Sequence, residues 1–298
     1  MNSKSGISPS KVFLPQNDLN HQTVLDFLIH QFPAISEDEW VSRLNDGLVF
    51  DADRITLDVS SPYQSNTFIY YFKRVQEEEH IPFKEQIIYQ DDHLLIADKP
   101  HFLPVTPGGH YLEETLLVRL KKLTGLETLS PIHRIDRETA GLVAFSKLPE
   151  DRNAYQALFR DRAVKKVYEA IAPYKDDLKN RFPIHYQSRI EESDVFIQMQ
   201  EVSGEPNSES TIELLEVNGS WAKYKLLLGT GKKHQLRLHM SALGLPIKHD
   251  QIYPVLKPHV VTGKDFTQPL QLLAKELSFV DPVTGHDHCF LSQQALQL

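Results

Sequence analysis

The sequence predicts an α+β protein with a mixed, mainly antiparallel central sheet and flanking helices. Helical and strand-like segments are intermingled without the regular βαβ alternation of a doubly wound fold. Several strand-like segments follow one another between residues 165 and 228 with little helix between them. The chain has 298 residues and is 41% hydrophobic, so it is large and apolar enough to bury a substantial core.

A small helical and hairpin module is expected over residues 1–80. After about 20 residues expected to form a loose arm, Thr23 begins a segment with helical apolar spacing that stops at Pro33. Ser36 and Glu39 have the spacing of a capping box, which predicts a second helix ending near Gly47. Strands are expected over 48–59 and 67–74. The charged connector over 77–82 marks a domain boundary.

Residues 81–298 are expected to form the larger domain. An Asp-Asp-His turn at 91–93 between two apolar runs predicts a β-hairpin over 86–97. The remaining expected elements are helices over 115–123, 149–160 and 233–243, and strands over 142–145, 165–171, 186–190, 195–199, 211–217 and 221–228. A loop is expected over 104–109.

Composition excludes several classes of protein. The sequence contains no apolar run long enough to span a membrane and no secretory leader at its start. A single cysteine, Cys289, excludes an internal disulfide framework and favours a reducing, cytoplasmic location. We expect a monomer.

The formal net charge of −8, taken alone, argues weakly against a nucleic-acid partner. The distribution of the charged residues along the chain removes this argument. Residues 1–100 hold 8 Lys and Arg against 16 Asp and Glu, so they account for the whole −8. Residues 217–249 contain no acid and six Lys or Arg, and a second basic cluster lies over 152–166. Such clusters can produce a local positive field that the net charge of the whole chain hides. The alternative is that they are ordinary solvated faces. If RNA is bound, residues 81–298 should bind it, and the N-terminal module weakly or not at all.

The densest group of polar residues lies in Pro131–Leu142. Asp136 is flanked by His133, Arg134 and Arg137, three side chains that are or can become cationic. Such neighbours keep a carboxylate ionised at neutral pH, so that it can act as a nucleophile or base. A surface salt-bridge loop is the alternative.

A second group follows a glycine turn at Gly229–Gly231. Lys232, Lys233, His234 and Arg237 lie at the start of a predicted helix, where free backbone N–H groups also favour an anion. The same segment is compatible with a capped amphipathic helix whose apolar face enters the core. It lacks the spacing of a phosphate-binding loop, and His234 and His239 are five residues apart, so no metal site is expected.

The third group is the strand-like Val164–Ala170, in which Tyr168 follows two lysines. A lone strand tyrosine is usually part of the core. An aromatic ring beside a basic strand is also a surface on which an extruded base can stack.

Taken together and in this order, these groups resemble the RluA-type family of pseudouridine synthases. The blocks are His133-Arg-Ile-Asp136, the Lys-x-Tyr strand ending at Tyr168, and Thr230-Gly-Lys-Lys-His-Gln-Leu-Arg-Leu-His239. Asp98-Lys-Pro before them, and Asp250 and Tyr253 after them, also stand at family-like places. The similarity spans about residues 85–298. The N-terminal module resembles, loosely, a small RNA-binding module of ribosomal-protein type.

The resemblance implies an RNA pseudouridine synthase that isomerises uridines in structured rRNA or tRNA without a cofactor. Asp136 matches the catalytic aspartate, Tyr168 the tyrosine that stacks on uracil, and Arg237 the arginine that orients the carboxylate. Arg134 resembles the arginine that fills the space of the flipped nucleotide. The other residues expected to contact RNA are His133, Arg137, Thr139, Lys166, Lys232, Lys233, His234 and Gln235.

Departures from the family pattern leave alternatives open. Ala140 replaces a usual serine, Lys232-Lys233 replaces Arg-x, and Lys248-His249-Asp250 is unusual. One alternative is a catalytically silent RNA-binding protein of the same fold. Another is a hydrolytic nucleosidase, which would need Glu138 to turn inward as the second carboxylic acid.

Overall fold

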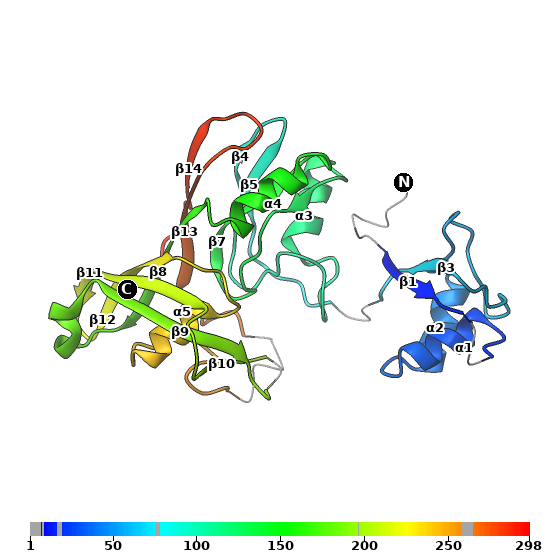
Figure 1. Cartoon of the computed structure of the whole chain (residues 1–298), viewed down its shortest axis with the longest axis horizontal. Helices are drawn as coiled ribbons and strands as arrows, with labels where there is room; N and C mark the ends of the chain where they lie inside the picture. Colours follow the sequence, from blue (N-terminus) through cyan, green and yellow to red (C-terminus); the bar gives the residue numbers. More distant parts are fainter. Residues whose placement is uncertain (1–6, 8, 17–19, 75–77, 196, 258–264) are drawn as a thin grey trace. The chain divides into compact units, whose positions relative to one another are not determined.

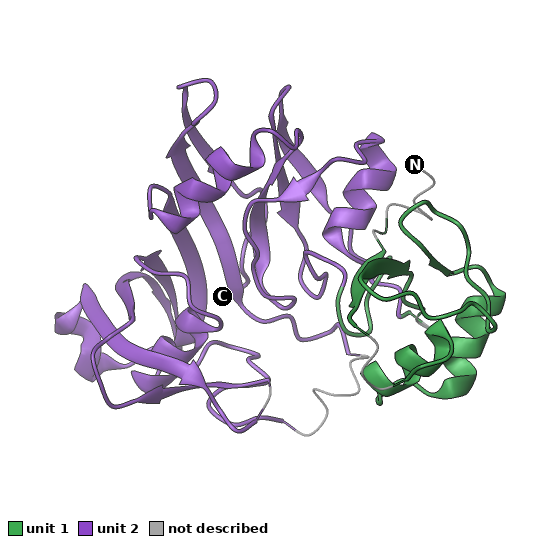
Figure 2. Ribbon diagram, turned by 45° about the vertical axis from the view of Figure 1, so that its right-hand side comes forward, with its two compact units in different colours: residues 1–78, 108–113 green, residues 79–107, 114–298 purple. Residues whose placement is uncertain are grey.

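A computed structural model describes residues 7, 9–16, 20–74, 78–195, 197–257 and 265–298. The chain divides into two compact units (Figure 2). Unit 1 comprises Met1–Glu78 with Gly108–Glu113, and unit 2 comprises Glu79–Pro107 with Glu114–Leu298. Residue 77 of the expected connector, and residues 1–6, 8 and 17–19 of the expected arm, lie outside the described residues.

Unit 1 packs two helices on a three-stranded antiparallel sheet of order β1-β3-β2 (Figure 1). The elements are β1 (Ser10–Leu14), α1 (Val24–Gln31), α2 (Glu37–Asn45), β2 (Val49–Phe50) and β3 (Thr67–Tyr71). The expected loose arm is therefore wrong over residues 10–14, which pair with β3. The strand expected over 48–59 is also wrong beyond Phe50, because Asp51 and Asp58 each accept backbone N–H groups that close turns.

The capping box predicted at Ser36 is confirmed in one half only. Ser36 accepts the backbone N–H of Glu39, but the Glu39 carboxylate pairs with Arg43 and leaves the reciprocal half of the box unmade. The complete capping box is at Thr23 and Asp26, where each side chain accepts the other residue's backbone N–H.

Unit 2 is built on a mixed sheet of order β10-β9-β11-β12-β8-β13-β7-β5-β4, with β14 paired to β13 and β6 to β7 (Figure 1). Its strands are β4 (Gln86–Gln90), β5 (Leu94–Lys99), β6 (Ser130–Pro131), β7 (Ala140–Ser146), β8 (Lys165–Pro173), β9 (Ile184–Glu192), β10 (Met199–Val202), β11 (Ser208–Asn218), β12 (Trp221–Leu228), β13 (Leu272–Val280) and β14 (Asp287–Leu291). Among the described pairings only β13 with β7 is parallel. The α+β, mainly antiparallel prediction is confirmed.

Helices α3 (Leu116–Thr124), α4 (Arg152–Arg160) and α5 (Gln235–Ala242) accompany this sheet. Helix α4 begins three residues after the expected start at Pro149, and α5 begins two after the expected start. Residue 196 of the strand expected over 195–199 lies outside the described residues. Over the other residues before Met199 the expected strand is wrong, because the Ser193 side chain closes a turn with Val195 and β10 starts at Met199. Strands β13 and β14 were not expected. None of the described helices is long and apolar enough to cross a membrane.

The core of unit 2 fixes the two segments that carry the site. Leu236 and Met240 of α5 pack among buried side chains of β8 and β12, and Tyr168 belongs to the same cluster. Tyr155 of α4 packs in a second cluster with Leu94 and Leu142 from β5 and β7. The loop before β7 and the start of α5 are therefore both anchored by buried apolar contacts.

Gly141 allows β7 to approach β13 in the parallel pairing. Its φ is +112°, and a Cβ there would lie 2.3 Å from the carbonyl oxygen of Ala274. We expect Gly141→Ala to lower the free energy of unfolding by about 2–4 kcal/mol, because the clash is with backbone and cannot be relieved by a rotamer change. Gly108→Ala, where no atom lies within 4 Å, is the control and should change stability little. Equal unfolding curves for the two variants would contradict this expectation.

Candidate active site

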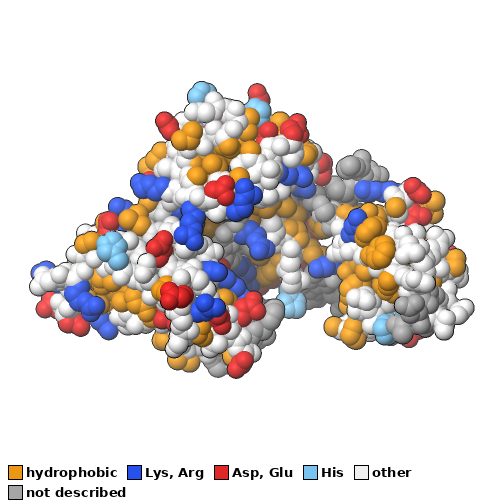
Figure 3. All heavy atoms as spheres, viewed as in Figure 1, with side chains coloured by type: hydrophobic (Ala, Val, Ile, Leu, Met, Phe, Trp, Pro, Cys, Tyr) orange, Lys and Arg blue, Asp and Glu red, His pale blue; other side chains and the backbone are white. Residues whose placement is uncertain are grey.

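A cavity of about 1040 Å³ in unit 2 brings the three sequence groups together. It lies where Lys and Arg side chains gather on the hollowed surface of the unit (Figure 3). All twelve residues proposed from the sequence line it: His133, Arg134, Asp136, Arg137, Thr139, Lys166, Tyr168, Lys232, Lys233, His234, Gln235 and Arg237. Groups separated by up to about a hundred residues therefore share one cavity.

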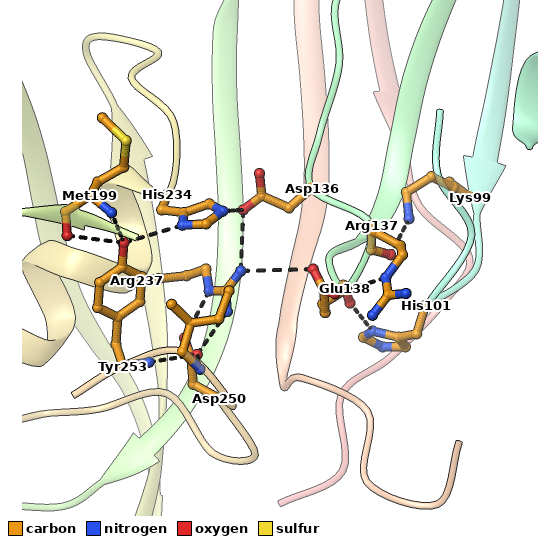
Figure 4. A network of polar contacts seen from close by, with 11 residues as sticks. Lys99, His101, Asp136, Arg137, Glu138, Met199, His234, Arg237, Asp250 and Tyr253 are labelled. Carbon is orange, nitrogen blue, oxygen red and sulfur yellow. Dashed lines mark hydrogen bonds and ion pairs between the residues drawn. The ribbon is translucent and has the colours of Figure 1, made fainter. Parts of the chain in front are cut away.

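Asp136 faces a buried arginine. Nη1 of Arg237 lies 3.6 Å from Oδ2 of Asp136 and 3.8 Å from Oε2 of Glu138 (Figure 4). Neither distance is a hydrogen bond, and Nη1 is a buried donor without a hydrogen-bond partner among the described residues. One donor of this guanidinium is thus directed at the two carboxylates and left unsatisfied.

The rest of the Arg237 guanidinium is held by Asp250. Nε and Nη2 donate to the two Asp250 oxygens at 2.8 and 2.7 Å, and both side chains are only 1% exposed. Burial opposes the charge of Arg237, but Asp250, Asp136 and Glu138 outweigh it and raise its pKa. The bidentate pair fixes the guanidinium plane, which a lysine could not do.

His234 approaches Asp136 from the same side. Its Nε2 lies 4.0 Å from Oδ2 of Asp136, and its Nδ1 lies 3.1 Å from the Tyr253 hydroxyl. Burial lowers the pKa of His234, while Asp136 opposes that shift. The residue has φ +55°, so the backbone turns into α5 through a left-handed conformation.

The backbone of the Asp136 loop is held from beneath by β5 and the residues that follow it. Nζ of Lys99 donates to the carbonyls of Pro100 and Arg137 at 2.9 and 3.0 Å. The ring Nδ1 of His101 lies 2.7 Å from the carbonyl of Glu138 (Figure 4). The two residues after the carboxylate are therefore fixed through their main chain.

Lys99 makes the stability of this loop depend on pH. Lys99 is completely buried, and burial lowers its pKa from 10.5 to about 7. Above that pH the unfolded chain binds more protons at this residue than the native chain, so the native state gains stability as pH rises. Relative to Lys99→Met, the wild type should gain up to about 1.4 kcal/mol per pH unit between about pH 7 and pH 10.

Urea unfolding of both proteins across this pH range measures the difference. Lys179→Met, at an exposed position, is the control and should show no pH-dependent difference from the wild type. A difference between wild type and Lys99→Met that stays constant with pH would show that Lys99 does not change protonation on unfolding.

Tyr168 presents its ring to the cavity from β8. The side chain is 9% exposed, and burial followed by the nearby Asp136 raises the pKa of its hydroxyl. The phenol is therefore neutral at ordinary pH. A neutral ring fixed by the core beside a carboxylate is suited to stacking against a planar base.

His133 differs from the expected cation. Its Nε2 accepts the backbone N–H of Ala144 at 3.1 Å, its ring stacks on Phe159 with centroids 4.4 Å apart, and burial lowers its pKa to about 3. The prediction of a potentially cationic His133 beside Asp136 is wrong, because a ring that accepts this bond in a buried position stays neutral.

Gln235 also differs from expectation. Its amide oxygen accepts from Thr230 Oγ1 and the Lys232 backbone, and its amide nitrogen donates to Glu209 and Ser210. These four bonds hold the turn before α5 and leave the amide without free capacity for RNA. Thr139 is 2% exposed, and its backbone N–H donates to the Asp136 carbonyl.

The cations expected to meet phosphate are available. Arg134 is exposed, and the side chains of Arg134, Lys166 and Lys232 form no hydrogen bond or ion pair with any residue that the structure describes. Burial lowers the pKa of Lys166, followed by the effect of Arg162. The cavity rim thus keeps uncompensated positive charge, although the whole chain is acidic.

Comparisons with known proteins show the family of this chain. The sequence model of the family described as RNA pseudouridylate synthase matches residues 93–242, half of the chain. The dual-specificity RNA pseudouridine synthase RluA of Haemophilus influenzae is 30% identical over 218 residues, which are 68% of this chain and 90% of that protein.

The chain belongs to the RNA pseudouridylate synthase family.

Within this family, the chain has an RluA-type sequence and the activity of an RNA pseudouridine synthase, an isomerase. An RNA pseudouridine synthase of Synechocystis, described as uncharacterized, is 28% identical over 77% of this chain and 79% of its own length. The human RNA pseudouridylate synthase domain containing 4 superposes with a TM-score of 0.53 at 27% identity, covering 71% of this chain and 88% of that one.

Sequence reasoning gave no role to several residues of this pseudouridylate synthase site. Asp250 and Tyr253 were noted only for their position, although together they hold Arg237 and His234. His101 carries no sequence signal, because its contact is to a backbone carbonyl. The signal that could have identified Asp250 is the need of a buried arginine for a carboxylate partner. In the described part of the chain, no three His, Cys, Asp or Glu side chains are grouped to hold a metal ion.

Proposed function

We propose that this RNA pseudouridine synthase acts on uridines of structured rRNA or tRNA and that Asp136 is its catalytic carboxylate. The observation that supports this best is the Asp136 carboxylate in a basic cavity, facing the unsatisfied Nη1 of Arg237 at 3.6 Å. Relatives provide the substrate classes: the Haemophilus protein is called a dual-specificity RNA pseudouridine synthase, and a yeast relative a tRNA pseudouridine(32) synthase.

In the proposed reaction Asp136 attacks the ribose of the flipped uridine or removes a proton from it. The bond between ribose C1′ and uracil N1 breaks, the base rotates, and C1′ joins C5. The proton displaced from C5 is lost to solvent and N1 regains one, so no redox partner is required. Arg237 orients the carboxylate and Tyr168 stacks on the uracil, which keeps the detached base close to the ribose.

The cations on the rim have a separate proposed role. Arg134 fills the space of the flipped nucleotide, while Lys166, Lys232 and Lys233 contact phosphates together with Arg137 and the start of α5. Lys233 and Arg137 also have contacts within the protein. The catalytic roles depend on the loop and the helix start that the core clusters anchor.

The environment of Glu138 argues against the nucleosidase alternative. Glu138 does turn inward, but its carboxylate contacts Arg137 at 2.9 Å and Arg237 at 3.8 Å. Burial raises its pKa, and the two guanidinium groups outweigh burial and lower it. An ionised carboxylate is a poor proton donor, so the second acid that hydrolysis would need is missing in this position.

One assay separates the three functions. RNA transcribed with tritium at uracil C5 is incubated with the purified chain, and water, free uracil and retained RNA are counted. Tritium release into water is expected, because joining C1′ to C5 displaces that hydrogen. Free uracil would indicate a nucleosidase, and RNA binding with neither product would indicate the silent protein.

The division into a module over 1–80 and a catalytic domain over 81–298, a cytoplasmic location and a monomeric state are further proposals. The first is supported by the two compact units. The location is supported by the single Cys289, which is typical of a reducing compartment. Limited proteolysis, cell fractionation and light scattering of the purified chain test the three in turn.

A further inference from the structure

The outer face of the unit 1 sheet carries aromatic side chains where solvent-facing polar residues would be usual. Because strand side chains alternate, Val12, Leu14, Ile69 and Tyr71 enter the core beneath α1 and α2, and their neighbours point to the other face. Those neighbours are Lys11 and Phe13 on β1, Phe68 and Tyr70 on β3, and Phe50 on β2.

Two of these rings, Phe13 and Phe68, are exposed, whereas Tyr70 is half-buried and Phe50 is buried behind it. Phe13 is 44% and Phe68 39% exposed, and their ring centroids are 4.9 Å apart. Phe50 and Tyr70 lie nearly parallel with centroids 5.8 Å apart. Exposed aromatic rings in contact on an open sheet face mark a binding surface more often than a scattered single residue does.

One cation lies between the two ring pairs and another lies beside Phe50, since Nζ of Lys11 is also 5.9 Å from the centroid of the Tyr70 ring. Nζ of Lys11 lies 3.6 Å from the centroid of the Phe68 ring, and the Arg54 guanidinium lies 5.5 Å from that of Phe50. Neither side chain forms an ion pair with a residue that the structure describes. Asp51 and Asp53 share the turn with Arg54, but Asp51 is occupied by backbone N–H groups of that turn.

Several acidic residues of the described unit lie with the helices, away from this face. Asp26 belongs to α1, and Glu37, Asp38 and Glu39 begin α2, on the helical side of the sheet. Two cations on that side are already paired: Arg43 with Glu39, and Arg74 with Asp46. The acidic sum of residues 1–100 therefore hides a local arrangement in which the aromatic face carries free positive charge.

We propose that this face, defined by Lys11, Phe13, Phe50, Arg54, Phe68 and Tyr70, binds single-stranded RNA by stacking bases on the exposed Phe13 and Phe68 rings and pairing phosphates with the two cations. Aromatic rings alternating with cations on a sheet suit splayed bases and a polyanionic backbone, whereas a duplex hides its base faces. The identity of the ligand as RNA rests on the proposed function. The proposal differs from the expectation that the N-terminal module binds RNA weakly or not at all, and the experiment below decides between the two.

The test compares full-length variants by fluorescence anisotropy with a labelled short oligouridine and with a labelled RNA duplex. Phe13→Ala combined with Phe68→Ala should weaken oligouridine binding at least about tenfold and affect the duplex less, since two stacking rings are removed. Val59→Ala, at an exposed apolar site of the same unit, is the apolar control. Lys11→Gln should weaken binding and reduce its salt dependence, and exposed Lys179→Gln should do neither.

Ultraviolet cross-linking of wild type to oligouridine, followed by peptide mapping, gives an independent readout. Cross-links within residues 10–14 or 67–72 support the face, and cross-links confined to unit 2 overturn it. Unchanged oligouridine affinity of the double variant, or a wild-type dimer that the double variant converts to monomer, would also overturn it. Failure of the proposed function can be distinguished from failure of this binding face. In that case the wild type would release no tritium in the assay described under the proposed function.

Discussion

Asp136→Asn is expected to abolish pseudouridine formation while leaving folding and RNA affinity close to those of the wild type. The amide keeps the size of the side chain and its place opposite Arg237, but it is neither a nucleophile nor a base. Because the group proposed to react is lost, the rate should fall by at least about a thousandfold. Tritium release from C5-labelled RNA measures the rate, and anisotropy with the same RNA measures affinity.

The matched control is Asp177→Asn. Asp177 is an exposed acid on the short 3-10 helix Asp176–Arg181, and it does not line the cavity. The same change of one carboxylate to an amide there should leave the rate unaltered. If Asp136→Asn released tritium at a rate near that of the wild type, the carboxylate would have no chemical role.

The largest effect on stability is expected from Asp250→Ala. Asp250 and Arg237 are both buried at 1% exposure, and the substitution leaves a buried guanidinium without its bidentate partner. It also removes the acceptor for the backbone N–H groups of Ile252 and Tyr253. Removing one member of a buried pair typically costs about 3–5 kcal/mol, and we expect a loss of this size in the free energy of unfolding.

Glu191→Gln provides the comparison for an exposed pair. Arg189 and Glu191 are in contact at 2.7 Å, but their side chains are 40% and 47% exposed, so this substitution should change stability by less than about 1 kcal/mol. Urea unfolding measures both variants. Similar small effects for Asp250→Ala and Glu191→Gln would mean that Asp136 and Glu138 alone are sufficient to compensate Arg237.

The sequence was most informative where a local pattern has a local cause. The helix that begins after Thr23, the side-chain cap at Ser36 and the Asp91 turn between β4 and β5 were predicted because each pattern acts within a few residues. The strand β1 was missed because its partner β3 lies more than fifty residues away. Two partners of β13, the strands β7 and β8, are likewise distant in the chain, although its third partner β14 follows it directly.

The candidate site shows the same limit. Twelve of the residues that line the cavity were predicted through blocks with characteristic spacing, although their roles still rest on the family resemblance. His133 and Gln235 have different surroundings than expected. The His133 ring accepts a backbone N–H, and the Gln235 amide forms hydrogen bonds within the turn before α5. Asp250 was given no role because it acts by pairing with Arg237. The burial of Arg237, which makes this partner necessary, cannot be predicted from the residues next to it in the sequence.

The most direct measurement is a chemical map of pseudouridine in the rRNA and tRNA of cells that lack this protein and carry either the wild-type gene or Asp136→Asn. The proposed function predicts that at least one pseudouridine disappears without the protein, returns with the wild type and stays absent with Asp136→Asn. Identical maps in all three strains, or a site restored by Asp136→Asn, would contradict it.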